Sequence, residues 1–186
     1  MPFGSLWLPV IVSTVAVFVL SSLAHMVFKH HRSDHRGLPN EDAVAEVLRK
    51  GGAAPGVYFI PHCADPARMK DPAVLKKFAD GPVAIVTVMK SGVPALAKHL
   101  AQWALLCLLI SFTAAYVARH TLSYGADGLT VMRITGTVAF VGYAFGYLQG
   151  SIWEGIPWTN SLRGIADAAV YALATGLLFR LLWPAA

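Results

Sequence analysis

The order of hydrophobic and polar positions along the chain predicts four helices that cross a membrane. A spanning helix needs roughly 20 mostly apolar residues, and four stretches of this sequence meet that requirement. These predicted spans cover residues 6–28, 100–118, 129–152 and 164–183. The fold class that follows is an all-α membrane bundle of four transmembrane helices.

The residues between the first two predicted spans have the pattern of a small folded insert. Asn40, followed by two acidic residues, is typical of a helix start, and residues 57–60 predict a short strand. Asp71 and Pro72 predict the start of a second helix, and the β-branched run 83–89 predicts a stronger strand. If the two strands pair in parallel, the helix between them forms a right-handed crossover. We therefore expect a small α+β insert.

The predicted elements divide the chain into three parts. Residues 1–36 hold the first span and a basic, histidine-rich segment that follows it. Residues 37–96 form the insert, and residues 97–186 form a region of three transmembrane helices. An insert of this size has a marginal core on its own, so we expect it to lean on the membrane face or on a partner.

Composition supports a membrane protein. The 186 residues are 56% hydrophobic and 13% charged, whereas a soluble domain has about 25% charged residues. This deficit argues against a disordered chain and against a water-soluble enzyme.

The positive charges predict the orientation of the spans. Of 15 Lys and Arg residues, 11 lie between Lys29 and His99, and positively charged loops stay in the cytoplasm. The insert is then cytoplasmic, and both the N-terminus and the C-terminus lie outside. The same segment has seven acids and hence a net charge of +4, which suits anionic lipid headgroups. We expect membrane lipids as partners and no nucleic acid.

Small residues recur every four positions in the third and fourth predicted spans. Helices in lipid associate where such residues let their backbones approach, so we expect these spans to form a tight antiparallel hairpin. The alternative is that one stripe faces a second copy of the chain or another membrane subunit. On either interpretation, Gly146→Leu is expected to disrupt folding or assembly. The stripe residues are Gly142, Gly146 and Gly150, then Gly164, Ala168, Ala172 and Gly176.

Four polar residues fall at one depth, within about a turn of the predicted cytoplasmic boundary. They are His25, Gln102, Gln149 and Asp167, one from each span. Polar groups in spans tend to face the bundle interior and to mark functional paths, so this polar layer is a candidate site for a proton, a cation or a polar ligand. The alternative is that the layer belongs to the hydrated interface.

A second group of candidate ligands lies in the run KHHRSDH, which contains His30, His31 and His35. If the first helix continues into this run, His31 and His35 share a face at a metal-ligand spacing. His62 and Cys63 of the insert then complete a set of four ligands for a divalent metal. The alternative is a hydrated segment that faces lipid headgroups.

Four stretches of the chain carry a resemblance to other proteins. They read GGAAPGVYFIPH, DGPVAIVTVMKSG, AKHLAQWALLCLLISFTAAYVARHTL and IADAAVYALATGLLFRLLWP. Together they resemble an uncharacterised group of bacterial four-span inner-membrane proteins with a small cytoplasmic insert. The resemblance implies the same topology and a bacterial inner membrane, and it implies no activity.

The sequence contains no recognisable catalytic set, so three kinds of function remain open. The first is a non-catalytic accessory or assembly subunit of a membrane complex, working with other membrane subunits or as a homo-oligomer. The second is a small transporter or metal-handling protein that uses the histidine cluster or the polar layer. The third is an enzyme that acts on lipid or isoprenoid at the inner face, for which no motif is present.

Overall fold

The computed structural model describes residues 3–185 and divides the chain into two compact units. One unit combines Met1–His35 with Ala95–Ala186, and the other is Arg36–Pro94. The chain is mostly helical and has one small two-stranded sheet.

The first unit consists of four helices that are long and apolar enough to cross a membrane, which confirms that part of the prediction. Their labels and bounds are α1 (Trp7–Met26, preceded by the 3-10 turn η1, Phe3–Leu6), α4 (Leu96–Thr121), α5 (Gly128–Trp153) and α6 (Trp158–Leu181). The helices α4 and α6 begin earlier than the predicted spans at residues 100 and 164. The first turns of both helices carry polar or basic side chains, which a hydropathy pattern leaves out of a predicted span. Hydropathy predicts which residues prefer lipid, and it does not predict where the helical backbone begins.

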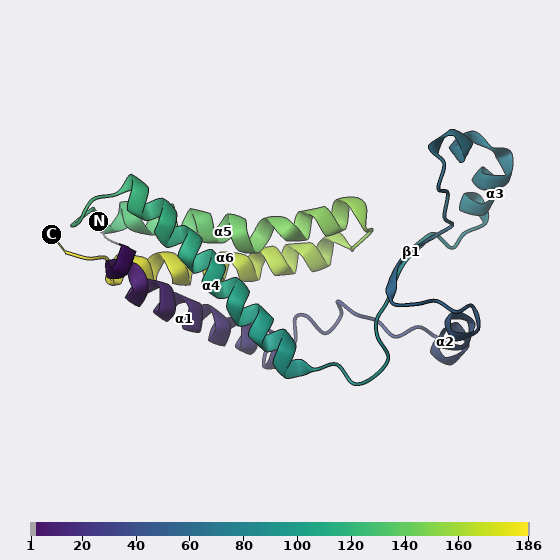
Figure 1. The fold of residues 1–186 in the computed structure, drawn as a ribbon, viewed down its shortest axis with the longest axis horizontal. Coiled ribbons are helices and arrows are strands. Elements are labelled where there is room, and N and C mark those ends of the chain that lie inside the picture. The colour runs from purple at the N-terminus through teal and green to yellow at the C-terminus, as the bar shows by residue number, and fades with distance from the viewer. Residues whose placement is uncertain (1–2, 186) are drawn as a thin grey trace. The chain divides into compact units, whose positions relative to one another are not determined.

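The four long helices form a closed ring in which each has two neighbours. Helix α5 packs against α4 and α6, and α1 packs against the same two helices from the opposite side. Helices α5 and α6 run side by side in opposite directions (Figure 1). The short connection between them passes through Gly155, whose φ of +70° is a conformation that favours glycine. Asp127 caps the start of α5 by accepting a hydrogen bond from the Thr130 amide at 2.9 Å.

The backbones of α5 and α6 approach each other closely at Gly136 and Gly176. A Cβ atom on Gly176 would stand 2.8 Å from the backbone oxygen of Met132 and 3.3 Å from the Cα of Gly136. A Cβ on Gly136 would stand 3.3 Å from the backbone oxygen of Ala172. The two backbones therefore touch, as they do where small residues meet in membrane helices.

The glycines of the predicted α5 stripe face three different surroundings. A Cβ on Gly142 would meet the Ile110 side chain of α4, and one on Gly150 would meet Ile156 in the α5–α6 connection. A Cβ on Gly146 would have no atom within 4 Å. On α6, Gly164 lies under the ring of Tyr147, and Ala168 and Ala172 are buried in the core.

The second unit contains α2 (Glu41–Lys50), β1 (Gly56–Ile60), η2 (Pro66–Lys70), α3 (Pro72–Asp80) and β2 (Ala84–Val88). The strands pair antiparallel, with Gly56 opposite Val88 and Ile60 opposite Ala84. A parallel crossover is therefore wrong for this insert. Such a crossover needs its helix to pack on the sheet, whereas α3 packs against η2.

The helix starts of the second unit follow the sequence only in part. Asp71 caps α3 by accepting a hydrogen bond from the Ala73 amide at 2.9 Å, and Pro72 takes the first helical position. Asn40 stands at the N-cap of α2, but its side chain makes no capping hydrogen bond.

No described residue of Arg36–Pro94 is buried. All five residues of β1 are exposed, including Val57 at 71% and Phe59 at 48%. A two-stranded ribbon is marginally stable in water unless something packs against it. The second unit thus has apolar side chains on its surface and no closed core.

Candidate functional site

The candidate site is built around the loop that leaves α1. Helix α1 ends at Met26, and the chain then turns instead of continuing as a helix. Two backbone hydrogen bonds mark the turns, from the Arg32 amide to the Lys29 oxygen at 3.1 Å and from the Asp34 amide to the His31 oxygen at 3.0 Å. The expectation that His31 and His35 share one helical face is therefore wrong. Ser33 and Asp34 favour such turns because their side chains compete for backbone groups.

The turn places His31 between two carboxylates. Its Nδ1 lies 2.6 Å from Oδ2 of Asp34, and its Nε2 lies 2.7 Å from Oδ2 of Asp167 on α6. The side chains of all three residues are about 85% buried, with exposed fractions of 15%, 14% and 14%. His30 also reaches Asp167, at 3.1 Å, and is more exposed. Two short bonds to carboxylates fix the plane of the His31 ring.

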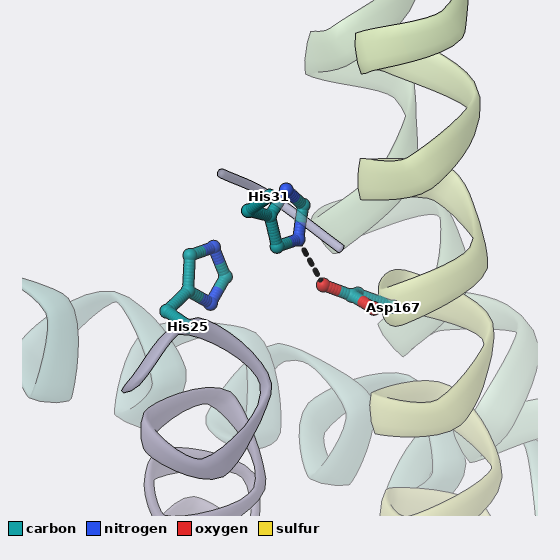
Figure 2. Close-up of side chains that lie close together, drawn as sticks. All are labelled: His25, His31 and Asp167. Atoms are coloured by element: carbon teal, nitrogen blue, oxygen red, sulfur yellow. Dashed lines mark hydrogen bonds and ion pairs between the residues drawn. The ribbon is translucent and has the colours of Figure 1, made fainter. Parts of the chain in front are cut away.

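His25, in the last turn of α1, completes a close group with His31 and Asp167 (Figure 2). The rings of His25 and His31 are stacked, with centroids 4.4 Å apart and an interplanar angle of 9°. One ligand atom from each of the three residues lies within 4.8 Å of the other two. Metal–ligand bonds are about 2 Å long, so modest side-chain shifts would bring all three atoms onto one ion.

Each of the two histidines has its Nδ1 engaged elsewhere. Nδ1 of His25 lies 3.0 Å from the backbone oxygen of Ser21, and Nδ1 of His31 is held by Asp34. When Nδ1 carries the hydrogen, the lone pair is on Nε2, which is the usual state of a metal-bound imidazole. The Asp34–His31 pair corresponds to the carboxylate and histidine of a carboxylate–histidine–metal arrangement.

A second set of bonds anchors the loop to α6. Arg163 donates from Nη1 to Oδ1 of Asp34 at 2.6 Å and to Oγ of Ser33 at 2.8 Å. Asn160 donates from Nδ2 to the backbone oxygen of Asp34 at 3.1 Å. Asp34 thus joins the histidine to the helix that carries Asp167.

The charged groups around His31 shift the pKa values of His31 and Asp34. Burial by itself would lower the pKa of His31, but the hydrogen bonds and charges of Asp167 and Asp34 outweigh it and raise the pKa above the ordinary 6.5. Burial would raise the pKa of Asp34, but hydrogen bonds from His31 and Arg163 outweigh it and lower the pKa. Without a metal, the raised pKa of His31 favours its charged form, held between the carboxyl groups of Asp34 and Asp167. A divalent cation would take the place of the Nε2 proton.

The cluster borders a cavity of about 640 Å³ at this end of the bundle. This volume is within the range of small-ligand pockets. Its walls include His25 and His31, and also Asp34, the carboxylate that holds His31. Further polar groups on the walls are His35, Gln149 and Glu154. An ion held by three protein ligands at such a wall would keep an open position toward the cavity.

The structure brings together residues from the two candidate groups that the sequence predicts and separates others of the same groups. His25 and Asp167, expected in the polar layer, meet His31, expected in the histidine cluster. His35 and Gln149 line the cavity outside the close group, and Gln102 is exposed on α4. His62 and Cys63 belong to the second unit, where the Cys63 thiol donates to the backbone oxygen of Asp65.

Arg163 and Asn160 are the site residues that sequence reasoning missed. Both lie in the first turn and a half of α6, ahead of the apolar run that marks the span. Helical spacing could have identified them. Asn160, Arg163 and Asp167 are three and four residues apart, so they share one face of the helix.

Comparisons with known proteins give this site no precedent. No family model, no curated protein and no solved structure matches the chain.

Proposed function

We propose that this chain is a multi-pass protein of the bacterial inner membrane, with both termini outside and the insert in the cytoplasm. The four long apolar helices support a spanning bundle. The 11 basic residues between Lys29 and His99 support a cytoplasmic insert. The cluster of His25, His31 and Asp167 then lies at the cytoplasmic end of the bundle.

The function we propose is the binding of a divalent transition-metal ion by His25, His31 and Asp167. The observation that carries this proposal is that one ligand atom from each of the three residues lies within 4.8 Å of the other two. The Nδ1 atoms of both histidines are hydrogen-bonded to acceptors, which leaves Nε2 for the metal. Two imidazoles and a carboxylate suit Zn²⁺ and ions of similar preference. The cavity beside the cluster has polar groups such as Gln149 and Glu154 on its walls and gives the ion a route to water, as a metal-handling protein requires.

Zinc binding by the purified full-length chain tests this function. We expect about one Zn²⁺ per chain in equilibrium dialysis followed by elemental analysis. His31→Ala removes one ligand and is expected to weaken binding more than 100-fold, beyond the 10–100-fold typical of an outer partner. The control is His120→Ala, because His120 lies outside the cluster and, like the ligand His25, bonds a backbone oxygen through Nδ1. Equal zinc content in the two variants would contradict the proposal.

A second function is favoured by a separate observation. The unit Arg36–Pro94 has no buried residue and exposes Val57 and Phe59 on a two-stranded ribbon. A surface of this kind supports the expectation of an accessory subunit whose insert packs against another protein of a membrane complex.

Site-specific photo-crosslinking in cells tests the accessory function. A photoreactive residue at Val57 is expected to yield one discrete adduct, whereas the same residue at the exposed, charged Lys76 is expected to yield none. Identical adduct patterns at both positions, or none at either, would count against it.

A further inference from the structure

A second cavity, of about 540 Å³, lies along α5 and α6. Its apolar walls include Met132 and Phe140 from α5 and Leu173 from α6. The small residues Gly136 and Ala172 also line it, at the place where the two backbones touch. Close backbones with larger side chains around them leave a groove suited to a hydrocarbon chain.

This groove also holds one ionised side chain. Arg133 lines it, and among residues 3–185 no carboxylate forms an ion pair with Arg133. Arg133 lies five residues into α5, about 8 Å along the axis from the first residue Gly128. A guanidinium at that depth is costly unless it is paired or reaches the headgroups.

The groove also contains the hydroxyl group of Thr137, close to Arg133 along α5. Thr137 lines the same groove one helical turn beyond Arg133, on the same face of α5. An arginine and a hydroxyl above an apolar channel complement a phosphodiester with neighbouring ester oxygens and an acyl chain.

We propose that this groove is a binding site for one anionic glycerophospholipid, with its phosphate on Arg133 and an acyl chain along α5 and α6. The inference rests on the proposed membrane placement and is independent of the metal. The site lies in the leaflet next to the chain termini, since α5 begins and α6 ends there.

Native mass spectrometry of the full chain, released from nanodiscs of phosphatidylglycerol and phosphatidylcholine, tests the site. The wild-type chain is expected to retain one phosphatidylglycerol in preference to phosphatidylcholine. Arg133→Gln is expected to reduce that preference about fivefold, the value of one basic residue at an anionic surface. Ala169→Leu, which fills the groove wall, is expected to do the same without a change in charge.

The control is Arg119→Gln, in the last turn of α4 at the same end of the bundle. It is expected to leave the retained lipid unchanged. An equal loss in Arg119→Gln and Arg133→Gln would mean that any nearby charge attracts the lipid, and would overturn the site. Alkaline extraction of cell membranes that contain the chain distinguishes failure of the lipid site from failure of the membrane placement. A chain that stays inserted but shows no lipid preference overturns only this inference, whereas an extracted chain overturns the membrane placement as well.

Discussion

Gly176→Leu is expected to destabilise the bundle of four long helices severely. A Cβ at this position already meets the Met132 backbone oxygen at 2.8 Å, and backbone cannot yield as a flexible side chain can. Overpacking of this kind costs about 3 kcal/mol. We expect the melting temperature to fall by about 10 °C.

The buried thiol of Cys107 gives a direct measurement of this change. Cys107 is 0% exposed in the core of the bundle, so a thiol-reactive dye labels it only on unfolding, in a Cys63→Ser background. Gly146→Leu is the matched control, because its Cβ would have no atom within 4 Å. We expect it to melt close to the parent, contrary to the expectation from the glycine spacing. Equal destabilisation of the two variants would contradict the close contact between α5 and α6.

Asp167→Ala is expected to have the largest effect on metal binding. The change removes a ligand atom and also the partner of His30 and His31. We expect more than a 100-fold loss in zinc affinity. Asp34→Ala removes only the carboxylate behind His31, a change that typically costs 10–100-fold.

The order of these two losses separates a metal site from a simple ionic latch between the loop and α6. Isothermal titration with Zn²⁺ measures both affinities, and the dye assay on Cys107 shows whether each variant remains folded. A metal site predicts the greater loss for Asp167→Ala. A latch predicts that both variants loosen the loop and that neither changes zinc binding relative to the parent.

The parts of the fold that depend on hydropathy and on helix capping were predictable from the sequence. The four apolar helices follow from the length of their apolar runs, and the Asp71 cap follows from local chemistry. The direction of strand pairing was not predictable, because the residue pattern of two short strands is compatible with either direction, and the strands pair antiparallel while α3 packs against η2. The Gly136–Gly176 contact was also not predictable, because Gly136 lies outside the regular four-residue spacing that includes Gly146.

The candidate site was predictable in pieces but not as a whole. His25 and Asp167 stood out as polar residues within apolar runs, and His31 stood out in a cluster of histidines. Joining them requires the turn after Met26, which depends on tertiary bonds from Asn160 and Arg163 to Asp34. Such bonds between residues about 130 positions apart leave no local pattern in the sequence.

X-ray absorption spectroscopy at the zinc edge tests the central claim most directly. Zinc bound to the purified full-length chain should show a first shell of nitrogen and oxygen near 2 Å. The outer-shell scattering should correspond to two imidazole rings, and to one ring in His25→Ala or His31→Ala. A first shell of oxygen alone, or an imidazole count that is unchanged in both variants, would contradict a metal centre formed by His25, His31 and Asp167.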